Sequence, residues 1–177
     1  MAENDWQSPE WGRARATQLR TSVEAQNLLA KNRMSEGWDG VSVARSLADH
    51  RVQSLRSHFL TVSEATKIKQ SQRISLLVTG GLGRNEISPY SDLDLVLICD
   101  HPDSDEMRSF ANAFFYPLWD SGLDIGHAIR RPSDFYELLG QDITVLTASL
   151  DWRPVAGDGM LLREFSDGLN NVLRSEE

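Results

Sequence analysis

The sequence predicts an α/β (α+β) domain with a mixed sheet and helical flanks at both ends. Three observations predict this class: two long stretches with apolar residues at helical spacing come first, short apolar runs bounded by turn residues follow, and helical stretches then alternate with these runs. A chain of 177 residues has the length of one ordinary domain. We expect a helical N-terminal extension over residues 1–65, packed on a mixed α/β part over residues 66–177.

The N-terminal extension is expected to hold two amphipathic helices. Apolar residues recur at helical spacing over residues 8–34, and Pro9 stands where a first helical turn tolerates proline. The glycine-containing stretch 36–40 interrupts this pattern. A second apolar stripe follows over residues 43–60. We expect both helices to serve as scaffold.

The rest of the chain is expected to alternate strands and helices. Apolar runs between turn residues predict four strands, the last a short edge strand, at residues 74–78, 92–98, 123–129 and 153–156. Amphipathic stretches predict helices at residues 104–120, 142–150 and 159–174. This order is typical of a mixed sheet covered by helices.

Composition narrows the function classes. Acidic residues outnumber basic ones, 26 to 18, for a net charge of −8, which argues against a nucleic-acid partner because such binding depends on clustered Lys and Arg. Cys99 is the single cysteine, so no intrachain disulfide forms, and we expect it in the core. The N-terminus lacks the pattern of a secretory signal, and no apolar run reaches membrane-spanning length. We expect a cytoplasmic protein with no membrane partner.

One pair of acidic residues indicates metal chemistry. Asp92 and Asp94 are two apart in a predicted strand, so they project from one face of a segment otherwise suited to burial. Adjacent carboxylates repel unless a cation lies between them, and Mg²⁺ binds carboxylates together with phosphate oxygens. Asp124, at the start of the next strand, is the best candidate for a third carboxylate. The alternative interpretation of the pair is a solvated strand end or a helix cap.

A pair of glycines precedes these acids. Gly80 and Gly81 end a predicted strand and open a helical turn, where backbone amides without a neighbouring side chain can approach a phosphate closely. Taken alone, the pair also suits an ordinary turn. Together with the acids it suits in-line nucleotidyl transfer, in which one metal holds a triphosphate and a second activates the attacking hydroxyl.

Several polar residues near these motifs have more than one interpretation. Arg84 either contacts phosphate or holds its loop through an acid such as Glu86. Asp124 either takes part in catalysis, as metal ligand or as base, or caps the turn before it. His127 and Arg130 are candidates for contacting the triphosphate or the acceptor, and His127 also suits a histidine buried in the core.

Three blocks of sequence resemble a known family. Gly80-Gly81 followed by Asp92-Leu93-Asp94 is similar to the motif of the DNA polymerase β-like nucleotidyltransferase superfamily. The blocks GGLGRNEISPYSDLDLVLI, LWDSGLDIGHAIR and DITVLTASLDWRPVAGD resemble the N-terminal domain of the bacterial PII uridylyltransferase/uridylyl-removing enzymes. The resemblance covers roughly residues 36–160.

This resemblance implies a function and a set of site residues. It implies that residues 66–177 form a nucleotidyltransferase domain that uses Mg²⁺ or Mn²⁺ and transfers UMP from UTP, or AMP from ATP, to a tyrosine of the trimeric PII protein. By position it assigns phosphate binding to the glycine pair, a possible nucleotide contact to the residue before the first acid, and metal binding to three carboxylates. These residues are Gly80 and Gly81, Ser91, and Asp92, Asp94 and Asp124.

The chain departs from the family in residues and in length. Leu82 stands where an aromatic residue is usual, Asn85 where a small residue is commoner, and Asp124 where Glu is frequent; these changes do not threaten the metal site. The HD-type phosphohydrolase and paired ACT domains of these enzymes have no match here, so uridylyl removal and glutamine sensing are not assigned to the chain. Two alternatives stay open: transfer to another acceptor, as in glutamine synthetase adenylyltransferase, or a catalytically silent nucleotide-binding regulatory module.

Overall fold

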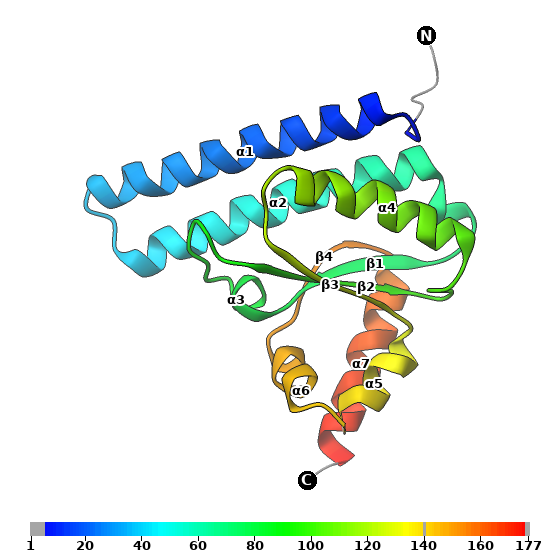
Figure 1. Cartoon of the computed structure of the whole chain (residues 1–177). Coiled ribbons are helices and arrows are strands. Elements are labelled where there is room, and N and C mark those ends of the chain that lie inside the picture. Colours follow the sequence, from blue (N-terminus) through cyan, green and yellow to red (C-terminus); the bar gives the residue numbers. More distant parts are fainter. Residues whose placement is uncertain (1–5, 140, 176–177) are drawn as a thin grey trace.

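A computed structural model of the chain describes residues 6–139 and 141–175. Figure 1 shows its elements in space. The helices are α1 (Pro9–Ser35), α2 (Gly40–Thr66), the short 3-10 helix η1 (Ile68–Gln70), α3 (Gly80–Gly83), α4 (Asp105–Asp120), α5 (Pro132–Leu139), α6 (Ile143–Leu150) and α7 (Gly159–Ser175). The strands are β1 (Ile74–Val78), β2 (Leu93–Cys99), β3 (Ile125–Arg130) and β4 (Arg153–Gly157).

The four strands form one mixed sheet in the order β3-β2-β1-β4. β1 pairs antiparallel with both β2 and β4. β2 and β3 run parallel, with Leu93 opposite Ile125 and Asp94 opposite Gly126. The predicted mixed-sheet α+β class is confirmed, and β4 lies at an edge of the sheet as predicted.

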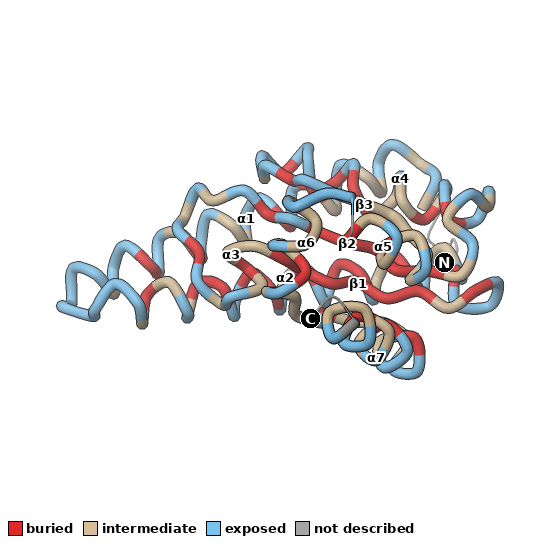
Figure 2. The backbone as a smooth tube through the Cα atoms, turned by 90° about the horizontal axis from the view of Figure 1, so that it is seen from below, coloured by how far each residue is buried: buried red, intermediate tan, exposed pale blue. Residues whose placement is uncertain are grey.

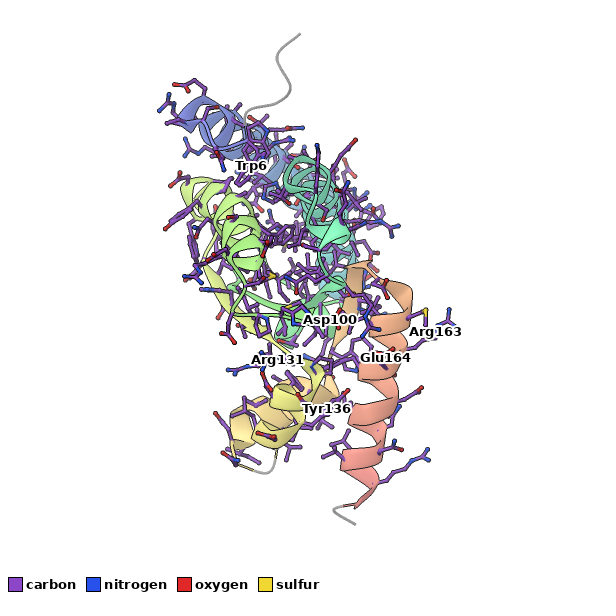
Figure 3. The ribbon with its side chains drawn as sticks, turned by 90° about the vertical axis from the view of Figure 1, so that its right-hand side faces the viewer. Trp6, Asp100, Arg131, Tyr136, Arg163 and Glu164 are labelled. Atoms are coloured by element: carbon purple, nitrogen blue, oxygen red, sulfur yellow. The ribbon has the colours of Figure 1, made fainter. Side chains whose placement is uncertain are left out.

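Helices cover both faces of the sheet. Figure 1 shows α1, α2 and α4 above it and α5, α6 and α7 below it, and the side view in Figure 3 shows the same three layers. The α1–α2 hairpin extends past the sheet, and its far end is largely exposed in Figure 2. None of the described helices is both long enough and apolar enough to cross a membrane.

Strand residues alternate between an upper core and a lower core. β1 is buried along its whole length, as expected for a strand covered on both faces. On β2, Leu93 and Leu95 pack into the upper core with residues of α1, α2 and α4, whereas Val96 and Ile98 pack into the lower core with residues of α5 and α7. Because the side chains of a strand alternate, Asp94 faces the same side as Val96.

Local sequence signals set the helix starts. Ser8, Asp39 and Ser104 each accept a hydrogen bond from a backbone N–H three residues further on, at the N-termini of α1, α2 and α4. α5 was not expected from the sequence. It has eight residues, starts at Pro132 and buries few side chains, so it is too short to show a helical period.

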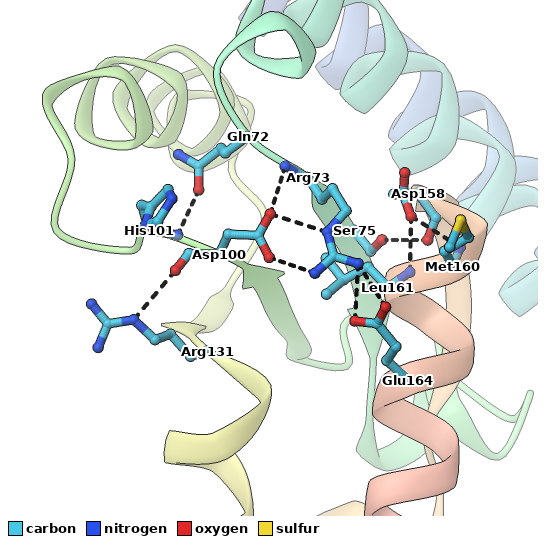
Figure 4. Close-up of polar contacts among 10 residues, drawn as sticks. All are labelled: Gln72, Arg73, Ser75, Asp100, His101, Arg131, Asp158, Met160, Leu161 and Glu164. Carbon is cyan, nitrogen blue, oxygen red and sulfur yellow. Dashed lines mark hydrogen bonds and ion pairs between the residues drawn. The ribbon is translucent and has the colours of Figure 1, made fainter.

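A charged cluster fixes the far end of β2 to α7 (Figure 4). Arg73 donates to the Asp100 carboxylate from its backbone N–H and from its side chain, and to both carboxylate oxygens of Glu164 at 2.8 and 2.9 Å. The hydrogen bond from Arg73 is the main cause that holds the pKa of Asp100 below its usual value. Asp158 caps α7 by accepting from the N–H of Leu161 at 2.8 Å. One end of the sheet is thereby tied to the lower layer.

His58 of α2 is a buried titratable group at the contact with α4. Its Nε2–H donates to the carbonyl oxygen of Phe114 at 2.9 Å, and the two rings stack with centroids 5.0 Å apart. Burial is the main cause that lowers the pKa of His58 to about 4, and the nearby charge of Arg15 acts in the same direction. The ring is therefore neutral at pH 7.

We predict that protonation of His58 weakens the fold in mild acid. The unfolded chain takes up this proton near pH 6.5 and the folded chain only near pH 4, so the free energy of unfolding falls through that window, by about 3 kcal/mol in total. His58→Gln keeps an N–H donor for Phe114 but does not titrate. Urea unfolding at several pH values should show a shallower decline for the variant between these limits, and parallel declines would contradict the assignment.

Candidate active site

Asp92 and Asp94 lie where the loop after α3 enters β2. Asp92 comes one residue before the strand and Asp94 is its second residue, and both are exposed. Partial desolvation of its carboxylate raises the pKa of Asp94, and the negative charge of Asp92 raises this pKa further. The charge of Asp92 thus acts on Asp94, and a cation shared by the two carboxylates stays a prediction. No basic side chain of the described residues forms an ion pair with either of them.

Two glycines make room for the Asp94 carboxylate, because neither has a side chain. A Cβ on Gly80 would lie 2.9 Å from Asp94 Oδ2, and a Cβ on Gly126 would lie 2.7 Å from Oδ1, which are both closer than real Cβ contacts. Gly80 also has a φ of 60°, a conformation that residues with side chains rarely adopt. The N–H of Thr79 donates to the backbone carbonyl of Asp94 at 3.0 Å. The carboxylate thus lies between the glycine turn and the neighbouring strand β3.

Gly81 packs against its own loop instead of bordering Asp94. A Cβ at this position would meet the carbonyl oxygen of Glu86 at 3.0 Å and the side chain of Ile87 at 3.4 Å. The N–H of Glu86 donates to the carbonyl of Gly81 at 2.9 Å. The absence of a side chain here is explained by closure of the turn, and the phosphate contact expected of Gly81 stays a prediction.

Asp124 lies beside Asp92 at the start of the parallel strand pair. The N–H of Leu93 donates to the backbone carbonyl of Asp124 at 2.9 Å, and strand pairing begins one residue later. Among the described residues, no three His, Cys, Asp or Glu side chains gather closely enough to hold a metal ion. The role of Asp124 as a third ligand or as a base therefore stays a prediction.

The chemistry of the acid pair fits a hard divalent cation. Asp92 and Asp94 are two carboxylates with no basic partner among the described residues, and Mg²⁺ is usually bound through one or two carboxylates, with water and phosphate oxygens completing the shell. Two protein ligands are therefore sufficient for an ion that arrives with a phosphorylated substrate. Mn²⁺ accepts the same oxygen ligands.

The loop of residues 84–92 is held by ion pairs to distant segments. Arg84 pairs with Asp151 at 3.0 Å, so it holds its loop through this acid and not through Glu86. Glu86 pairs instead with Arg45 of α2 at 3.1 Å. The expectation that Arg84 fastens the loop is met with a different partner, and its contact with phosphate stays a prediction.

Further contacts fix the same loop from within and from β4. Asn85, which has a φ of 61°, accepts a hydrogen bond from Arg153 of β4, and Arg153 also pairs with Asp49 of α2 at 2.9 Å. The hydroxyl of Ser91 accepts from the N–H of Ser88 at 3.0 Å. Ser91 therefore stabilises the turn that leads into the acid pair, and its nucleotide contact stays a prediction.

A pocket of about 270 Å³ lies beside Asp94 on the lower side of the sheet. Its walls come from the turn after β1, from β2 and β3, and from α5 and α6. Asp94 lines it from β2, Arg130 from the end of β3 and Asp142 from just before α6, and most of the remaining lining residues are apolar. Among the lining residues are Thr79, Gly126, Ala128, Arg130, Phe135 and Val145.

His127 and Arg130 point to opposite faces of β3. The His127 ring lies 4.5 Å from that of Phe115 and 5.3 Å from that of Trp119, both on α4 of the upper layer. His127 is exposed, because β3 is an edge strand, so it packs on aromatic rings without being the buried core histidine that the sequence favoured. Arg130 lies on the pocket side with Gly126 and Ala128.

Two parts of the site were missed in the sequence. Gly126 makes room for Asp94 from a neighbouring strand, and the available signal was that it follows Asp124 by two residues and so shares its face. The α5 wall of the pocket, with Phe135, was missed because α5 itself was not expected.

Comparison with known proteins gives one consistent result. No family model matches the chain. It is 45% identical over 85 residues to a bifunctional uridylyltransferase/uridylyl-removing enzyme of Streptomyces coelicolor, covering 48% of the chain and 10% of that enzyme. Enzymes of the same name from Caulobacter vibrioides and Mycobacterium tuberculosis are each 32% identical, over 158 and 129 residues, covering 86% and 68% of the chain. The chain spans only 17% and 16% of these two relatives.

We predict that Gly126→Ala weakens cation binding without unfolding the protein. The added methyl group displaces the Asp94 carboxylate, and loss of ligand orientation typically costs about 10–100-fold in metal affinity. Titration calorimetry with Mn²⁺ should show this loss. Gly12→Ala is a matched control, because a Cβ there meets nothing within 4 Å. Equal Mn²⁺ affinity in both variants would show that Gly126 does not position Asp94.

Proposed function

We propose that this chain, a homologue of one part of the bifunctional uridylyltransferase/uridylyl-removing enzymes, is a nucleotidyltransferase domain that depends on Mg²⁺ or Mn²⁺. The observation that carries the proposal is the Asp92–Asp94 pair: the charge of Asp92 raises the pKa of Asp94, and the Asp94 carboxylate lies between two glycines beside a pocket. A bound cation would relieve the repulsion on Asp94, and perturbed acids beside a pocket are typical of functional sites. We place the protein in the cytoplasm.

The chain's own residues take separate roles in this proposal. Asp92 and Asp94 hold the cation, which supplies neutralisation of the triphosphate charge when bound. Gly80 and Gly126 keep the Asp94 carboxylate in place. The remaining assigned residues act on the nucleotide or the acceptor: Gly80 and Gly81 through their backbone, Ser91 and Arg84 through side chains, and Asp124 as third ligand or as base.

The proposed reaction is an in-line displacement at the α-phosphorus of UTP or ATP. The acceptor hydroxyl oxygen forms a new bond to this phosphorus as the bond to the β-phosphate oxygen breaks, and pyrophosphate leaves. The hydroxyl proton passes to Asp124 or to water. The contribution of the protein is positioning and electrostatic stabilisation, for which the firmly held loop of residues 84–92 is suited.

For the acceptor we propose a tyrosine of the PII protein, which follows from the resemblance of the sequence to the PII uridylyltransferases and not from the geometry of the pocket. The test is incubation of the chain with PII, Mg²⁺ and UTP or ATP, followed by intact-mass spectrometry of both proteins. A mass increase of PII by one nucleotide is the expected result. Labelling of a different protein, such as glutamine synthetase, would favour the first alternative. Magnesium-dependent triphosphate binding without pyrophosphate release on any acceptor would favour a silent regulatory module.

We predict that Asp92→Asn and Asp94→Asn separate activity from stability. Each variant should lower transfer by at least about 100-fold, a loss typical of one strong transition-state contact. The unfolding temperature at pH 7 should stay equal or rise, because the raised pKa of Asp94 means that the fold disfavours its charge at neutral pH. Thermal unfolding and product mass measure the two effects.

The matched control for these variants is Asp167→Asn, which removes an exposed acid of α7 away from the pocket. It should keep full transfer. Retained turnover in either site variant would refute the role of that carboxylate, and a fall in unfolding temperature would contradict the electrostatic repulsion described above.

A further inference from the structure

The pocket beside Asp94 has two chemically different ends. Asp94 and Thr79 line it beside the glycine turn, and Arg130 lines it at the C-terminal end of β3, next to apolar residues that include Phe135 and Val145. Asp142 also lines the pocket. Arg130 is half-buried, and it forms no ion pair with any described residue. A guanidinium exposed to a largely apolar pocket without a protein partner is available for a ligand.

The strand fixes the separation of these ends. Gly126 is paired with Asp94, and Arg130 is four residues further along β3, opposite Ile98. A strand rises roughly 3.3 Å per residue, so about 13 Å of backbone separate the two positions. If the α-phosphate of a nucleotide lies at the acid pair, Arg130 is too distant for that phosphate group. We take the nucleoside, and not the β- and γ-phosphates, as the part that extends along β3 toward Arg130, and the tripolyphosphate probe below tests this choice.

We propose that Arg130 is a specificity-determining residue that recognises the nucleobase, and that it favours uracil over adenine. This assignment rests on the proposed function, since it takes the acid pair as the place of the phosphates. A guanidinium only donates hydrogen bonds, and uracil presents carbonyl oxygens that accept them. Adenine has no carbonyl oxygen: its amino group donates, which opposes a guanidinium, and only its ring nitrogens accept.

The shape of the pocket agrees with a small base. Its volume of about 270 Å³ is slightly below the common range of about 300–1,000 Å³ for small-molecule sites. Ala128 and Val96 form its floor on the sheet, and Phe135 of α5 lines it opposite them. An apolar slot of this size accommodates a flat pyrimidine ring, with the guanidinium at its polar edge.

Binding of three probes to the whole chain tests the proposal: UTP, ATP and inorganic tripolyphosphate, each with Mg²⁺, measured by titration calorimetry. The wild-type chain should bind UTP at least about tenfold more tightly than ATP, the effect of about one hydrogen bond to a charged group. Arg130→Ala should lose most of this preference while its affinity for tripolyphosphate stays unchanged. Arg130→Lys should also lose preference, because Lys keeps the charge but not the planar fork.

Arg131→Ala is the matched control. The neighbouring guanidinium pairs with Asp103 and Asp134 and donates to the carbonyl of Asp100, a contact that Figure 4 shows. Arg131 is not among the residues that line the pocket, so its loss should leave the preference intact. Circular dichroism shows whether each variant is folded.

The outcomes separate the two levels of the argument. If Arg130→Ala weakens tripolyphosphate as much as UTP, Arg130 contacts phosphate and the assignment to the base is wrong. An unchanged ratio of UTP to ATP affinity in this variant overturns it equally. If the wild-type chain binds none of the three probes in the presence of Mg²⁺, the proposed function fails, and the role of Arg130 fails with it.

Discussion

The Asp94 carboxylate imposes the constraint on which the rest of the site depends. Its oxygens fill positions that a methyl group on Gly80 or Gly126 would take, and the charge of Asp92 opposes its ionisation. Selection for folding alone would not favour an acid there, since crowding and like charge both act against it. Local conflicts of this kind are typical of functional sites, because function and not stability maintains them. Gly80 and Gly126 make room for the Asp94 carboxylate. The long-range ion pairs of the adjoining loop help to hold that carboxylate in position.

A single strand supplies both the stability and the chemistry of the domain. β2 has a neighbour on each side, and its residues alternate between the two cores. Leu93 and Leu95 anchor it against the upper helices, and Val96 anchors it against the lower ones. Asp94 occupies the one lower-face position of the strand that the helices leave open. The site is therefore as rigid as the sheet itself, which favours catalysis by positioning.

The sequence predicted most of this structure wherever the signal was local. The long helices and the four strands follow from apolar periods that extend over many residues, and the acid pair follows from a spacing of two in a strand. The role of Gly126 was missed, because the face it shares with Asp124 does not give the register between β2 and a strand that lies 32 positions further along the chain. One interpretation of Arg84 paired it with a nearby acid such as Glu86. In the structure it pairs with Asp151 from the α6–β4 turn, a residue that only the three-dimensional fold brings close to Arg84.

The ion pairs of the 84–92 loop also bear on where the functional unit begins. Arg45 and Asp49, which fasten Glu86 and Arg153, belong to α2 and thus to the segment that the sequence set apart as an N-terminal extension over residues 1–65. A chain shortened to residues 66–177 would keep every assigned ligand yet lose two ion pairs that support the loop, together with the part of the upper core that α1 and α2 supply. Substrate binding would then have to order that loop, and the entropy lost in doing so would lower the affinity for substrate. The N-terminal hairpin is therefore better regarded as a buttress of the active site than as an appendage to it.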